Sequence, residues 1–182
     1  TVGPIEALRL VPPEILRFLV ANSKPSKAIE FDTGMGLVNL ADEYERLCAR
    51  DLAGEMEAEN LSRRKRVQLE DAMVALDLSV VHEDQDSVAT SVSFRHLSLL
   101  AQVKPEDDAV WDSLRSTGSI DQPTEALKDR LILMRSWIAS EHFPDEMRIT
   151  LLEAPSAAAL NELPVDQRKV LVALETNLRS AD

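Results

Sequence analysis

Apolar residues recur at helical spacing along most of the chain. From Leu37 to Cys48, from Leu127 to Ile138 and from Val165 to Leu178 they fall three or four residues apart. This spacing gathers apolar side chains on one side of a helix and predicts amphipathic helices that bury that side. Nine prolines against five glycines indicate that prolines mark the joints between helices. Proline fits the first turn of a helix and disfavours helix in the residue before it.

One short stretch has a different period. Residues 28–32 alternate apolar and charged side chains, which predicts a short strand or an extended segment. Residues 67–81 are compatible with a helix, and residues 82–91 are acidic and rich in Ser, as expected of a loop. The predicted fold class is therefore all-α, a helical bundle or cage of about seven helices with at most one strand near residues 28–32.

Net charge is the compositional feature that most restricts function. The chain carries 20 Lys and Arg against 32 Asp and Glu, a formal net charge of −12. A non-specific nucleic-acid binder draws its affinity from phosphate neutralisation, which an acidic protein does not favour. A reader of unstacked single-stranded bases needs only a local basic patch, so this class stays open. The acidic charge also suits a helical protein-interaction module, which is the alternative function.

Few residues in the chain suit metal or redox chemistry. The single cysteine, Cys48, excludes an internal disulfide and fits a reducing cytoplasm. No apolar run approaches the length that crosses a bilayer, and we expect a cytoplasmic protein. His82 and His142 lack the spacing that would close a metal site, so no metal is expected. Trp111 and Trp137 have apolar neighbours at helical spacing, which favours a place in the core over base stacking.

Three motifs carry most of the information in the sequence. They are the PPE motif (Pro12–Val20, PPEILRFLV), the KPSK joint (Lys24–Lys27) with the IEFD stretch that follows it, and the DEYER motif (Asp42–Arg46) within a GLVNLADEYER helix. In this order they resemble the segment that follows the ATP-loop signature of class I lysyl-tRNA synthetases. The FRHL motif (Phe94–Leu97) resembles a segment that begins a helix in the tRNA-binding part of the same enzymes.

The resemblance implies a division of roles along a longer enzyme. Such an enzyme activates lysine with ATP and Mg²⁺ and transfers it to tRNA(Lys), using HIGH-like and KMSKS-like signatures that this sequence does not contain. Residues 1–35 would be the junction that follows the catalytic domain, and residues 36–182 a helical anticodon-binding cage that is truncated at its C-terminal end. We therefore expect the chain to bind tRNA(Lys), to hold no catalytic residue and to need no cofactor of its own.

The expected tRNA contacts are basic or stacking side chains in and beside these motifs. They are Arg95, His96, Arg63, Arg64, Lys65, Arg66, Lys24 and Lys27. Arginine and histidine stack on exposed bases or bind phosphate, and the run 63–66 is the densest positive charge in the chain. Each group has a structural alternative. Arg95 and His96 can cap or bridge neighbouring helices, the run 63–66 can be a solvated surface, and Lys24 and Lys27 can be surface lysines on a turn.

Overall fold

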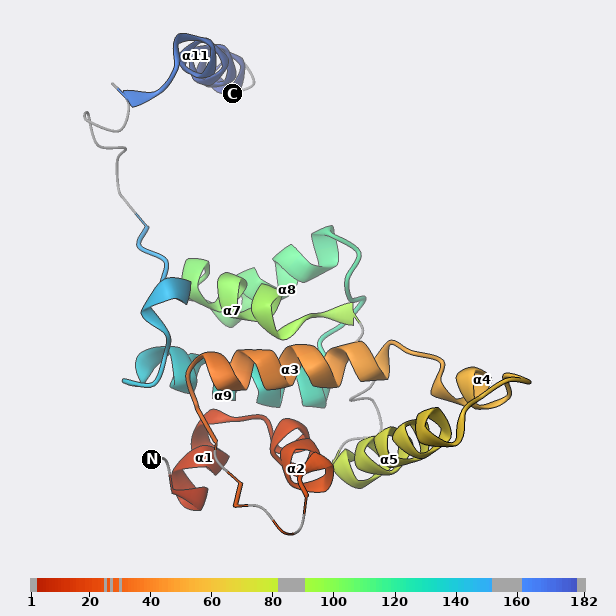
Figure 1. Ribbon diagram of the computed structural model, residues 1–182. Helices are drawn as coiled ribbons and strands as arrows, with labels where there is room; N and C mark the ends of the chain where they lie inside the picture. The colour runs from red at the N-terminus through yellow and green to blue at the C-terminus, as the bar shows by residue number, and fades with distance from the viewer. Residues whose placement is uncertain are drawn as a thin grey trace. The chain divides into compact units, whose positions relative to one another are not determined.

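Helices form the regular structure in the computed structural model of the chain (Figure 1). The structure describes residues 3–24, 26, 28–29, 31–81, 91–151 and 162–179. Their helices are α1 (Pro4–Leu10), α2 (Pro13–Asn22), α3 (Met35–Cys48), α4 (Leu52–Met56), α5 (Arg63–Ser79), α7 (Phe94–Val103), α8 (Asp107–Ser116), α9 (Glu125–Ala139), the 3₁₀ helix η1 (Asp145–Met147) and α11 (Val165–Arg179). The predicted all-α class is confirmed. The described residues of the stretch 28–32 carry no strand.

The chain divides into two compact units, Thr1–Ile149 and Thr150–Asp182. Helices α1 to α9 and η1 belong to the first unit, and α11 belongs to the second. The spacing in α11 predicts an inward-facing apolar side, but Val165 and Val170 are 66% and 67% exposed. This division by packing does not bear on the functional junction at residue 35, which stays a prediction.

Side chains at the helix starts explain why the elements begin where they do. Pro13 is the first residue of α2, as the sequence predicts. The hydroxyls of Ser62, Ser93 and Thr124 accept hydrogen bonds from backbone N–H groups in the first turns of α5, α7 and α9. Gly118, with a φ of 70°, ends the turn after α8. The N–H of the next residue then donates to the Leu114 carbonyl, which satisfies the end of that helix.

The core of the first unit is built around aromatic residues from different helices. The rings of Phe18 and Tyr44 lie 5.4 Å apart, where α2 packs on α3. Trp137 packs against Phe94 and Phe143 at centroid distances of 5.4 and 4.8 Å. Its indole N–H donates to the backbone carbonyl of Thr33 at 2.6 Å. Trp137 is fully buried, so its predicted place in the core is confirmed.

Helix α7 is held at both ends, and this fixes the position of the FRHL motif. Helix α3 lies between α2 and α7 (Figure 1) and supplies groups to the start of α7, described below. At the other end, the guanidinium of Arg135 on α9 donates to the carbonyls of Ala101 and Lys104 at 3.1 Å each. The same guanidinium also donates to Asp107 at 2.8 Å. A cation at the C-terminal end of a helix satisfies its unpaired carbonyls and opposes the negative end of the helix dipole.

Candidate nucleic-acid interface

The basic run Arg63–Arg66 forms the first turn of α5, and all four side chains are exposed. Positive charge is unfavourable at the N-terminal end of a helix, because the helix dipole is positive there. The run therefore does not serve the stability of α5. Lys65 lies 3.6 Å from Glu55 of α4. In the described part of the chain no ion pair joins Arg63, Arg64 or Arg66 to a carboxylate.

A polar groove of about 400 Å³ lies beside this run. It is lined by residues from the end of α2, from α3 and the turn after it, and from α5: Asn22, Glu43, Arg46, Leu47, Arg50, Lys65, Gln68, Leu69, Asp71 and Ala72. Arg46 lies on α3, Arg50 follows the end of that helix and Lys65 lies on α5, so cations from both helices and from the turn between them face the same groove. We call the run 63–66 together with Arg46 the basic patch.

The two arginines of the groove are not equivalent. Arg50 donates two hydrogen bonds to Glu55, at 3.0 and 2.8 Å, and this carboxylate raises the pKa of Arg50 above its ordinary value. Arg46 is exposed and makes no ion pair within the described residues. Sequence reasoning did not select Arg46 or Arg50 as RNA contacts. The available signal for Arg46 was its place in the DEYER motif, which is part of the resemblance.

Arg95 of the FRHL motif contacts Asp42 of the DEYER motif. Its Nε lies 3.1 and 2.9 Å from the two carboxylate oxygens, and Nη2 lies 2.7 Å from one of them. The hydrogen bond that Arg95 donates to Asp42 raises the pKa of Arg95 above its ordinary value. Both side chains are about half exposed. Arg95 thus bridges α7 and α3, the structural alternative that the sequence left open, and an RNA contact by Arg95 stays a prediction. Half-buried His96 gives its backbone N–H to Ser93.

A buried ionic cluster lies next to this bridge. Glu45, one turn after Asp42, accepts the backbone N–H of Phe94 at 2.7 Å and lies 3.5 Å from Nη1 of Arg130. Arg130 also donates to Glu14 of the PPE motif, from Nε at 3.2 Å and Nη2 at 2.8 Å. Burial raises the pKa of Glu45 to about 7, against the opposing effect of Arg130.

The cluster shows what the motif residues do in this fold. The PPE, DEYER and FRHL motifs each contribute a group to one network, completed by Arg130 from α9. Sequence reasoning missed Glu14, Glu45 and Arg130 because acids and arginines in amphipathic helices are usually solvated. These residues join the helices on which they lie.

The remaining predicted residues do not line the polar groove or lie outside the described residues. Lys24 is exposed after the end of α2, and Lys27 lies outside the described residues, as does His82. His142 has its Nε2 3.4 Å from a carboxylate oxygen of Glu6.

Among the described residues, no group of three or more potential ligands is arranged to hold a metal ion. None of the helices described is both long and apolar enough to pass through a membrane.

Comparisons with known proteins point to one enzyme family. The family model described as tRNA synthetases class I (K) matches residues 1–72. The lysine–tRNA ligase of Thermoplasma volcanium is 30% identical over 159 residues, which are 86% of this chain and 28% of that protein. The corresponding ligase of Archaeoglobus fulgidus is 29% identical over 178 residues, 96% of this chain and 30% of the relative. No solved structure matches the chain.

A shorter match has a higher identity. Lysine–tRNA ligase 1 of Methanosarcina acetivorans is 57% identical over 42 residues, which are 23% of this chain and 8% of the relative. The Thermoplasma and Archaeoglobus ligases match most of this chain. The chain spans less than a third of the length of each of these curated relatives. The family model and these relatives agree with the resemblance carried by the motifs. We conclude that the chain belongs to the class I lysyl-tRNA synthetase family.

Proposed function

We propose that this chain is the tRNA(Lys) anticodon-binding portion of a class I lysine–tRNA ligase. Its role is binding, because the sequence contains neither a HIGH-like nor a KMSKS-like signature. Activation of lysine with ATP and Mg²⁺, and its transfer to tRNA, belong to the full-length enzyme. The observation that carries the proposal is the basic patch, which concentrates exposed arginines on a chain whose net charge is −12.

The basic patch has the chemistry that an RNA backbone requires. Arg63, Arg64 and Arg66 make no ion pair within the described residues, so RNA phosphates need not compete with a carboxylate for them. Each phosphate contact releases condensed counterions, so the affinity falls as salt rises. The positive end of the α5 dipole adds to the attraction for phosphate.

The groove beside the patch has groups that can distinguish bases. Asn22 and Gln68 contribute amide side chains to its lining, and amides donate to and accept from the edges of unstacked bases. Glu43 and Asp71 repel phosphate from the same groove. This arrangement favours phosphate contacts on the exposed run and base contacts in the groove. Binding of this kind is specific to a single-stranded loop, such as an anticodon loop.

The test measures binding of the chain to a tRNA(Lys) anticodon stem-loop and to a stem-loop with a changed anticodon, at several salt concentrations. We expect tighter binding to the first. The triple variant Arg63→Ala/Arg64→Ala/Arg66→Ala should lose at least tenfold in affinity and show a weaker salt dependence. The control variant Arg9→Ala/Arg115→Ala/Lys128→Ala changes the net charge equally on α1, α8 and α9, and should lose little.

Two results would contradict the proposal. Equal losses in the two triple variants would mean that net charge, and not the basic patch, sets the affinity. Equal binding of the two stem-loops, with a steep salt dependence, would reduce the interaction to general phosphate attraction and remove the anticodon from the function.

A further inference from the structure

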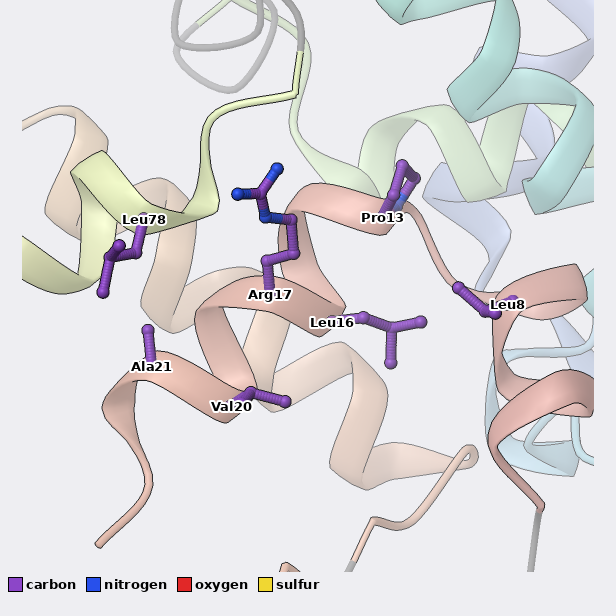
Figure 2. Close-up of a pocket in the computed structure, with 7 residues that line it drawn as sticks. All are labelled: Leu8, Pro13, Leu16, Arg17, Val20, Ala21 and Leu78. Atoms are coloured by element: carbon purple, nitrogen blue, oxygen red, sulfur yellow. The ribbon is translucent and has the colours of Figure 1, made fainter. Parts of the chain in front are cut away.

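An apolar groove of about 440 Å³ lies where α1, α2 and the end of α5 meet. Figure 2 shows its lining, which comes from Leu8, Pro13, Leu16, Val20, Ala21 and Leu78, together with Arg17. Leu8, Val20 and Leu78 are 61%, 62% and 52% exposed. Apolar side chains that gather around a hollow favour contact with another apolar surface.

The one charged residue of this groove is already bonded within the chain. Nη1 of Arg17 donates to the backbone carbonyl of Val80 at 2.8 Å, and the aliphatic part of the side chain lines the groove. The lining is therefore almost entirely carbon, and its single cation already donates a hydrogen bond to a carbonyl of this chain. Such a surface does not suit RNA, whose phosphates require positive charge, and it suits apolar side chains of a protein.

Helix α5 carries the basic run and this groove at opposite ends. Fifteen residues separate Arg63 from Leu78, which is about 22 Å along a helix axis. The polar groove and the apolar groove share no lining residue and differ in chemistry, although Asn22 and Ala21 at the end of α2 line one each. An occupant of the apolar groove would leave the start of α5 open to RNA.

We propose that the apolar groove is the docking surface for the portion of the full-length ligase that lies outside this chain. This inference rests on the proposed function, because it requires a longer ligase. The relatives supply the length, since residues aligned with this chain make up only 28% and 30% of two of them. The groove residues Leu8 to Ala21 lie within the stretch 1–72 that the synthetase family model matches. The occupant presents apolar side chains that fill the space between Leu8, Val20 and Leu78.

The test compares thiol labelling in the full-length ligase and in this chain alone. Val20→Cys and Leu78→Cys place thiols at the groove, and Ile132→Cys is the matched control, because Ile132 is 58% exposed on α9 and does not line the groove. All three positions are exposed, so the substitutions leave the core of this chain intact. Maleimide labelling at each position is followed by peptide mass spectrometry. We expect labelling at least tenfold slower at the two groove positions in the full-length enzyme, and equal rates at Ile132→Cys in both proteins.

Each other result overturns the proposal. Equal rates in the two proteins at Val20→Cys and Leu78→Cys would mean that the rest of the ligase leaves the groove open. Slow labelling of this chain alone that depends on its concentration would assign the groove to a second copy. Labelling slowed by an anticodon stem-loop would assign it to RNA. The stem-loop binding described above is measured separately, so loss of anticodon discrimination would refute the proposed function without changing the labelling result.

Discussion

The carboxylate of Glu45 accepts a hydrogen bond from the backbone N–H of Phe94 at 2.7 Å, so a side chain of α3 caps the first residue of α7. The same carboxylate lies 3.5 Å from the guanidinium of Arg130. One buried acid thus joins three helices that are far apart in the sequence. Because an acid can lose or gain a proton, this joint should respond to pH.

The free energy of unfolding should fall as pH rises from about 4.5 to about 7 because of Glu45. Burial raises its pKa from 4.5 to about 7 in the folded chain. Between these values the folded state holds a proton that the unfolded state has released, so stability present below the unfolded pKa is lost as pH rises toward the folded one. The loss amounts to at most about 3 kcal/mol.

The variant Glu45→Gln isolates this contribution, because the amide keeps an acceptor for the Phe94 N–H but does not titrate. Urea unfolding of both proteins at pH 5 and pH 8 measures it. The stability of the wild type relative to the variant should fall by about 2–3 kcal/mol between the two pH values. A difference that stays constant with pH would show that Glu45 is ionised throughout.

Replacing Arg130 with methionine should be strongly destabilising. Arg130 is 1% exposed and bonded to Glu14 and Glu45, so Arg130→Met leaves buried carboxylates without a counter-charge. Such a change costs about 3–5 kcal/mol. The loss in urea unfolding should be smaller at pH 5 than at pH 8, because a protonated Glu45 needs no counter-charge. The control Arg115→Met breaks the exposed pair with Asp112 and should cost less than about 1 kcal/mol. Similar losses for both variants would contradict the role of burial.

The helices were predictable and the ionic cluster was not, for a physical reason. Helix periodicity is local, so the buried side of α9 can be predicted from residues three or four apart, and Leu127, Leu131, Met134 and Trp137 are indeed buried. The cluster depends on partners 116 and 85 residues apart, Arg130 with Glu14 and with Glu45. Nothing in the local pattern distinguishes a buried arginine from a solvated one on the same kind of helix.

The basic run was predictable for a similar reason, and the full patch was not. Four consecutive cations at 63–66 are visible in any reading of the sequence. Arg46 joins them only because α3 packs against α5, which local spacing does not predict. The side chains of Glu14, Asp42 and Glu45 in the motifs that identify the family form hydrogen bonds between helices. Their residues therefore indicate ancestry and fold more directly than they indicate RNA contacts.

A role for Arg95 in RNA binding can be separated from its bridge to Asp42. If Arg95 contacts RNA, Asp42 competes with RNA for the same guanidinium, so Asp42→Asn should raise the affinity for the anticodon stem-loop severalfold. The gain should disappear in the double variant with Arg95→Ala. Stability should change little, because an exposed ion pair contributes less than about 1 kcal/mol. A gain that persists in the double variant would mean that only the lost negative charge matters, and would leave Arg95 a helix bridge.

The last prediction concerns Glu55, which holds two cations beside the basic patch. It accepts hydrogen bonds from Arg50 at 3.0 and 2.8 Å and lies 3.6 Å from Lys65. These cations lower the pKa of Glu55, chiefly through the Arg50 hydrogen bond, so the carboxylate stays ionised at neutral pH. Glu55→Gln releases both cations and should raise stem-loop affinity severalfold while steepening the salt dependence. Glu57→Gln makes the same charge change at an exposed acid without an ion pair in the described residues, and it should have a much smaller effect. Equal gains in the two variants would mean that RNA responds to net charge alone, and Arg50 and Lys65 would then have no specific part in binding.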